Sequence, residues 1–149
     1  MSTLENLILH ITTNIFMREF RQADTDTLDE VIESSGLKDR ISSLADGANT
    51  ILSREFDKYG AEFSIGEMQK ISLARAIARK AKVIILDEPT AGLDPKERVR
   101  FRNLISELGK KSIVLLSTHI VSDIEHVADK VLIMKEGQII YNDKNDILF

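Results

Sequence analysis

Hydrophobic residues recur every three or four positions at the start of the chain, which predicts a helix over residues 2–16 with one core-facing stripe. These apolar residues are Leu4, Leu7, Ile8, Ile11 and Ile15. Ser2 and Glu5 have the spacing of a capping box, which favours a helix start at this point. A helix lying on a membrane surface is the alternative, but its polar face would need the Lys and Arg residues that this face lacks. We therefore expect the stripe to pack in a core.

A second amphipathic helix is predicted over residues 26–35. Its apolar face holds Leu28, Val31 and Ile32. Gly36 suits the left-handed position that ends a helix, and Leu37 is the apolar residue that often follows it. A short helical piece over residues 38–44 and an irregular stretch as far as residue 60 complete this part.

The next elements alternate between helix and strand. Ser64 suits the N-cap of a helix that includes residues 68–79, and Glu67 suits the positive end of its dipole. Gly66 would let a ligand approach the backbone. The β-branched run of residues 83–86 then predicts a strand buried on both faces.

The last third continues this alternation. Pro95 suits the start of a helix that ends at Gly109 and buries one apolar face. That face comprises Phe101, Leu104, Ile105 and Leu108. Four further elements and a turn follow: buried strands at residues 112–116 and 131–134, a short helix at 121–127, and a turn at 136–137 into a strand at 138–141. The start of another helix is expected at 144–149, and the whole pattern predicts an α/β layered sheet.

Composition narrows the functional classes. The 149 residues are 43% hydrophobic and 30% charged, as in an ordinary globular domain with a core. A net charge of −4 argues against a nucleic-acid partner. The absence of cysteine excludes disulfides and thiolate metal sites. The chain has no apolar run of the ~20 residues that cross a bilayer and no secretory signal at its start.

Two predicted strands are followed by residues whose side chains could bind a metal or transfer protons. Asp87 and Glu88 follow the strand at 83–86, and His119 follows the strand at 112–116. Ligands bind at the carboxyl ends of the strands in an open parallel sheet. For an isolated acidic pair, capping or solvation is the ordinary explanation, and a lone histidine is usually structural. The motifs around these residues favour a functional role over these ordinary explanations.

Four motifs stand in a characteristic order: Phe63-Ser64-Ile65-Gly66-Glu67, the strand ending in Leu86-Asp87-Glu88, Ala91-Gly92-Leu93-Asp94 and Ser117-Thr118-His119. They resemble the signature motif, the Walker B strand, the D-loop and the switch histidine of the nucleotide-binding domains of ABC transporters. The resemblance implies a P-loop NTPase-like (RecA-like) α/β core with a parallel sheet, incomplete in this chain. Residues 1–80 would form the preceding helical subdomain, which carries the signature motif and its helix. Residues 81–149 would form the C-terminal part of the core.

The resemblance also implies roles for single residues around ATP and Mg²⁺. Asp87 would hold Mg²⁺, usually through water, whereas Glu88 would orient or deprotonate the attacking water and His119 would contact the γ-phosphate.

On the signature side, Ser64 and the amides around Gly66 would donate to a phosphate at the helix N-terminus. By resemblance, this phosphate belongs to an ATP held by a second subunit in a head-to-tail dimer. Asp94 would lie at the same interface. Ile65 replaces a commoner glycine and Glu67 a commoner glutamine. Glu67 therefore adds negative charge beside a triphosphate.

The phosphate-binding P-loop is missing from these 149 residues. By resemblance it should lie upstream of Met1, so we expect the chain alone to bind ATP weakly, fold marginally and be inactive. The complete ATPase would power transport with a transmembrane permease, peripherally at the cytoplasmic face of the cell membrane. Two alternatives stay open at this point: the C-terminal lobe of an SMC-like DNA-maintenance ATPase, which would show long coiled-coil heptads, and a non-catalytic truncated remnant.

Overall fold

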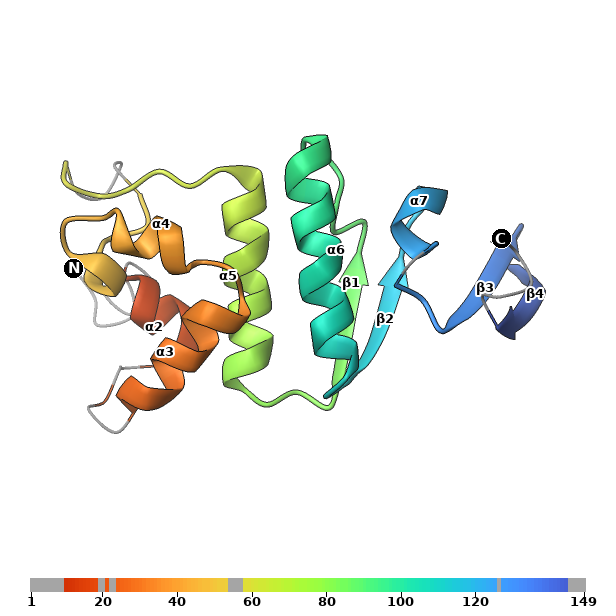
Figure 1. Ribbon diagram of the computed structural model, residues 1–149, viewed down its shortest axis with the longest axis horizontal. Coiled ribbons are helices and arrows are strands. Elements are labelled where there is room, and N and C mark those ends of the chain that lie inside the picture. The colour runs from red at the N-terminus through yellow and green to blue at the C-terminus, as the bar shows by residue number, and fades with distance from the viewer. Residues whose placement is uncertain (1–9, 19–20, 22–23, 54–57, 126, 145–149) are drawn as a thin grey trace. The chain divides into compact units, whose positions relative to one another are not determined.

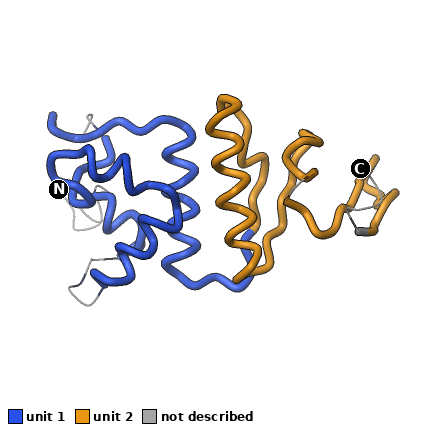
Figure 2. Tube along the Cα trace, in the orientation of Figure 1, with its two compact units in different colours: residues 1–84 blue, residues 85–149 orange. Residues whose placement is uncertain are grey.

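A computed structural model describes residues 10–18, 21, 24–53, 58–125 and 127–144 (Figure 1). The chain divides into two compact units, residues 1–84 and residues 85–149 (Figure 2). The functional division expected after residue 80 stays a prediction.

Unit 1 is helical in its described part. Its elements are α2 (Ile11–Phe16), α3 (Thr25–Ser34), α4 (Lys38–Ser42), the 3-10 turn η2 (Gly47–Asn49) and α5 (Ile65–Ala78). The helices predicted from residues 26, 38 and 68 are confirmed to within a few residues. The first helix is described only from Ile11, so the expected capping box of Ser2 and Glu5 lies outside the described residues.

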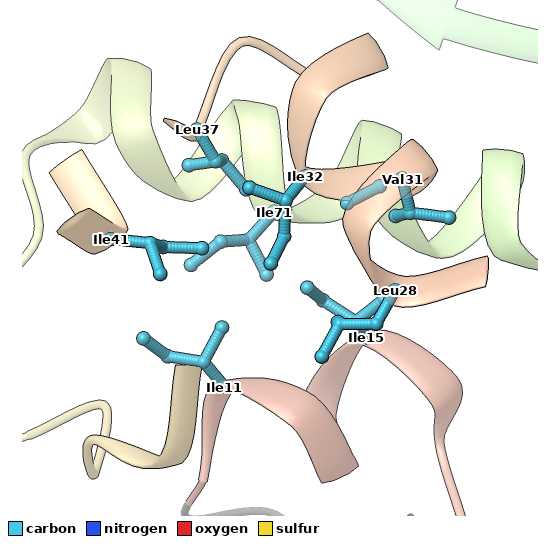
Figure 3. Packing of buried hydrophobic residues seen from close by; sticks show 9 residues of the cluster. Ile11, Ile15, Leu28, Val31, Ile32, Leu37, Ile41 and Ile71 are labelled. Atoms are coloured by element: carbon cyan, nitrogen blue, oxygen red, sulfur yellow. The ribbon is translucent and has the colours of Figure 1, made fainter. Parts of the chain in front are cut away.

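The core of unit 1 lies where α2 and α3 pack on α5 (Figure 3). Ile11 and Ile15 of α2 and Ile71 of α5 are completely buried. The other buried residues of this core are Leu28, Val31, Ile32, Leu37, Ile41 and Ala74. The core-facing stripe of the first helix is therefore confirmed at its two described positions, whereas Leu4, Leu7 and Ile8 lie outside the described residues.

The end of α3 shows why the glycine stands at position 36. Gly36 has φ +69°, a left-handed conformation that costs glycine little. This turn allows the Leu37 N–H to donate to the Ile32 carbonyl at 3.0 Å, which satisfies a carbonyl at the helix end. Leu37 then enters the core with no exposed surface.

Unit 2 continues the sheet that β1 (Val83–Asp87) begins. Its further elements are α6 (Pro95–Gly109), β2 (Ile113–Ser117), α7 (Val121–Ile124), β3 (Lys130–Lys135) and β4 (Gln138–Lys144). β1 and β2 are neighbouring parallel strands joined through α6, as the directions of their arrows show (Figure 1). β3 and β4 form an antiparallel hairpin whose turn, Glu136 and Gly137, has positive φ at both residues. The α/β prediction is confirmed.

The end of the chain departs from expectation in detail. α7 ends at Ile124, three residues before the predicted end of this helix. β4 runs to Lys144, where the start of a helix was expected. Residues 145–149 lie outside the described residues.

The predictions of a strand buried on both faces at residues 83–86 and of buried strands at residues 112–116 and 131–134 are wrong. The side chains of Val83 and Ile85 on β1 are 55% and 70% exposed, and those of Ile113 and Leu115 on β2 are 69% and 51% exposed. On β3, Val131 is buried, but Leu132, Ile133 and Met134 are 47%, 38% and 66% exposed. A β-branched run indicates a strand, but burial on both faces requires a layer of structure on each side. α6 packs on β2, and the exposed side chains show that no second layer covers them among the described residues.

β2 and β3 belong to separate two-stranded sheets in the described part of the chain. No helix among the described residues is long and apolar enough to cross a membrane.

Replacement of Ile71 by alanine should lower the free energy of unfolding of unit 1 by about 2–5 kcal/mol, because it leaves a cavity in a fully buried site. Urea unfolding of the 149-residue chain, followed by circular dichroism, measures the change. Met68→Ala on the same helix is the control, since Met68 is 40% exposed and its loss should cost about 0.5 kcal/mol or less. Equal effects of the two variants would contradict the packing described for α5.

Candidate functional site

The start of α5 is a complete capping box. The backbone N–H of Glu67 donates to Ser64 Oγ at 3.2 Å, and the backbone N–H of Ser64 donates to Glu67 Oε2 at 2.8 Å. The predicted N-cap at Ser64 is thus confirmed, and the sequence Ser-x-x-Glu explains it. By helix geometry, the N–H groups of Ile65 and Gly66 have no partner within the helix. The Ile65 side chain is 64% exposed, whereas Gly66 is buried.

Arg40 of α4 holds the other side of the Glu67 carboxylate. Its Nε lies 3.1 Å from Glu67 Oε1. Its Nη2 donates to the Glu62 carbonyl at 2.8 Å, and the guanidinium carbon lies 5.1 Å from the centre of the Phe63 ring. The Arg40 side chain therefore contacts Glu62 and Phe63 just before α5 and Glu67 in its first turn. Sequence analysis missed Arg40, although an acidic residue at position 67 was a reason to look for a basic partner.

The backbone turns sharply after β1. Glu88 has φ +44°, a left-handed conformation that costs a non-glycine residue about 1 kcal/mol or more. Its N–H donates to the Ser117 carbonyl at 2.8 Å, and its carbonyl accepts from the Ala91 N–H at 3.0 Å. The first bond joins the carboxyl ends of β1 and β2, so the loops that follow these strands start side by side.

The Glu88 carboxylate receives three donors from the loop after β2. Oε1 lies 2.7 Å from His119 Nδ1 and accepts the His119 N–H at 3.1 Å, and Oε2 accepts the Thr118 hydroxyl at 3.4 Å. These contacts, led by the hydrogen bond with the His119 side chain, lower the pKa of Glu88 and favour the carboxylate. The structure therefore brings together the two residues predicted as catalytic.

Asp87 and Asp94 flank this pair along the chain. Asp87 ends β1 and is exposed. Asp94 is the N-cap of α6, and its Oδ1 accepts the N–H groups of Lys96 and Glu97 at 2.9 and 3.0 Å. Asp94 thus stabilises the start of α6, and the adjacent Pro95 takes the first helical position as expected.

A magnesium ion here would need phosphate oxygens as well as protein ligands. No group of three or more His, Cys, Asp or Glu side chains among the described residues could hold a metal by itself. Mg²⁺ accepts one or two carboxylates together with substrate phosphates and water, so the single exposed carboxylate of Asp87 fits the ion.

Thr90, in the loop after β1, and Asp123, in α7, form a buried hydrogen-bonded pair. The Thr90 hydroxyl donates to Asp123 Oδ2, and both residues are 1% exposed. This bond ties the loop after β1 to α7, and Arg102 of α6 donates to the Ser122 carbonyl in the same short helix. Asp123 Oδ1 is buried and has no hydrogen-bond partner among the described residues. Sequence analysis missed this pair because neither residue carries a helical or strand pattern.

A model of the family described as "ABC transporter" matches residues 2–91, more than half of the chain. The chain belongs to the ABC transporter family. The resemblance that the four motifs indicated is confirmed.

The relatives of this ABC family member include ATP-binding proteins of transporters. The energy-coupling factor transporter ATP-binding protein EcfA2 of Streptococcus agalactiae is 41% identical over 85 residues, which are 56% of this chain and 30% of that protein. EcfA2 of Streptococcus pyogenes is 37% identical over 95 residues, 63% of this chain and 34% of that protein. The chain thus spans about a third of the length of these relatives.

A bacterial Atm1-family ABC exporter with ATP bound has a similar structure. The TM-score is 0.73 at 21% identity, over 94% of this chain and 23% of the exporter chain. This likeness concerns the fold alone, and it confirms the P-loop NTPase-like fold that the motifs predicted for this ABC family member.

The predicted site residues of this ABC family member fall into two groups. Ser64, Gly66 and Glu67 lie together in unit 1 at the start of α5, and Asp87, Glu88, Asp94 and His119 lie in unit 2, on β1 and in the loops that follow β1 and β2. Only Glu88 and His119 contact each other among the predicted residues of unit 2.

The Glu88 carboxyl should titrate below its ordinary pKa of 4.5, and His119→Ala should return this pKa towards 4.5, because the histidine is the main cause of the shift. A carboxyl with a lowered folded-state pKa stabilises the fold above the unfolded pKa, and this stabilisation is lost as the pH falls through the folded pKa. Carbon NMR of the carboxyl measures both titrations. His10→Ala, which removes a histidine from unit 1, is the control, and an unchanged Glu88 pKa in His119→Ala would contradict the contact.

Thr90→Val should destabilise unit 2 by about 1–3 kcal/mol, because it leaves a buried carboxylate without its donor. Thr90→Ser keeps the hydroxyl and should cost about 1 kcal/mol or less. Denaturant unfolding measures both variants. A Thr90→Val variant as stable as the natural chain would show that the buried bond contributes nothing.

Proposed function

We propose that the chain is part of an ATP-binding and ATP-hydrolysing subunit of an ABC transporter, which couples ATP hydrolysis to transmembrane transport. The observation that carries the proposal is the contact between Glu88 and His119 at the carboxyl ends of β1 and β2, in a chain of this family. It supports ATP hydrolysis because one loop contributes a carboxylate for water and the other a group for the γ-phosphate.

Glu88 orients the attacking water and accepts its proton as the phosphoryl bond breaks. A glutamate carboxyl is ionised at neutral pH, and the hydrogen bond with His119 lowers its pKa further, so the group is ready to accept a hydrogen bond from water. Its left-handed backbone and the Ser117 bond hold it at the edge of the sheet. Glu88 is thus fixed at both its backbone and its side chain.

His119 contacts the γ-phosphate through Nε2. Its Nδ1 faces Glu88, which leaves Nε2 on the outer edge of a side chain that is 79% exposed. The imidazole therefore links the water-binding carboxylate to the phosphate, and loss of the phosphate releases one end of this link. Mg²⁺ supplies charge neutralisation of the phosphates, and Asp87 is the residue that would hold it.

The start of α5 forms the second half of a nucleotide site. Ser64 and the N–H groups of Ile65 and Gly66 donate to the γ-phosphate of an ATP bound to a second ATPase subunit, and Asp94 lies at the same head-to-tail interface. A transmembrane permease is the further partner, and the assembly lies peripherally at the cytoplasmic face of the cell membrane. The names of the transporter relatives support these partners.

The 149-residue chain should bind ATP with a dissociation constant of about 1 mM or weaker, because no P-loop within it holds the phosphates. Nitrogen–proton NMR should show ATP-dependent shifts at residues 64–67 and at Glu88 and His119. Phosphate-release assays should find no more turnover than in Glu88→Gln.

AMP, which lacks the β- and γ-phosphates, is the control ligand and should leave these resonances in place. Micromolar ATP affinity in calorimetry would contradict the expected weak binding. Shifts confined to other parts of the chain would contradict the proposed site.

A further inference from the structure

The Glu67 carboxylate places a negative charge beside the proposed phosphate site, and a neighbouring side chain pairs with it. A carboxylate one turn from the helix start would repel the phosphates expected there, since like charges at close range oppose binding. Glu67 cannot move away freely, because Oε2 accepts the Ser64 N–H at 2.8 Å. Oε1 is the oxygen that the capping box leaves for another partner.

Arg40 forms an ion pair with that oxygen, although its Nε makes no hydrogen bond there. The Arg40 Nε lies 3.1 Å from Oε1, and the two side chains are 32% and 25% exposed, so the pair is partly shielded from water. The same guanidinium donates to the Glu62 carbonyl at 2.8 Å and lies over the Phe63 ring. An arginine that is fixed at three points loses less side-chain freedom in pairing with Glu67 than a free lysine would.

We propose that Arg40 is a positioning residue of the phosphate site. It holds the Glu67 carboxylate against the Ser64 N–H and neutralises its charge, and this allows an acidic form of the signature segment to accept a triphosphate. This inference rests on the proposed function, because the triphosphate is the ligand assigned to α5 there.

Four variants separate charge compensation from a purely structural role. With ATP as the probe and the shifts of Ile65 and Gly66 as the readout, Arg40→Ala should weaken binding about two- to fivefold, because Glu67 is then uncompensated. Glu67→Gln keeps the capping box and should change the ATP affinity less than about twofold, because Arg40 already offsets the Glu67 charge in the natural chain. The double variant Arg40→Ala/Glu67→Gln should return to the affinity of the natural chain.

The double variant decides between the two roles. If Arg40 acted only by holding Glu62 and Phe63, the double variant would bind as weakly as Arg40→Ala, and this result would overturn the inference. Lys38→Ala is the matched control, because it removes one positive charge from the same helix and Lys38 pairs with Glu33 instead. It should leave the ATP affinity unchanged.

A measurement without nucleotide tests the positioning by itself. Hydrogen exchange of the Ser64 amide should become faster in Arg40→Ala, because the carboxylate that accepts this N–H is no longer held from its other side. Unchanged exchange would overturn the positioning. Absence of any ATP-dependent shift at residues 64–67 in the natural chain would instead refute the proposed function at α5, and with it the phosphate role of Arg40.

Discussion

The hydrogen bond from the Glu88 N–H to the Ser117 carbonyl is the constraint on which the candidate site in unit 2 depends. It forms because Glu88 adopts a left-handed backbone conformation immediately after β1. The cost of that conformation is offset by this bond and by the three donors that reach the Glu88 carboxylate from the neighbouring loop. Strain of this kind is typical of functional sites, where surrounding contacts hold a residue in a conformation that it would otherwise avoid.

Several residues proposed for the candidate sites also have structural roles. Ser64 and Glu67 close the capping box of α5, and Asp94 caps α6. Capping is also the ordinary explanation that competes with function for such residues, and it accounts for part of what they do here. Glu88 is different, because its carboxylate binds the loop after β2 rather than the end of a helix. The case for chemistry is therefore strongest at Glu88 and His119.

The uncovered faces of β1 and β2 set this chain apart from a closed α/β domain. Exposed apolar strands lack the burial that normally stabilises a parallel sheet. Unit 1, in contrast, has a core of its own, in which α2 and α3 bury their apolar faces on α5. The larger share of apolar burial in this chain lies in its helical part, since the described strands of unit 2 leave much of their apolar surface exposed.

The sequence by itself predicted most of the helices and strands of this protein and indicated its family. Periodicity predicted α3, the N-cap residue Ser64 predicted the start of α5, Gly36 and Pro95 marked a helix end and a helix start, and the order of four motifs indicated the family. These signals depend on neighbouring residues alone. Tertiary structure decided which strand faces are covered, how Glu88 and His119 meet, and that Arg40 pairs with Glu67. Those outcomes depend on contacts between segments that are distant in the chain, and spacing within one segment carries no information about them.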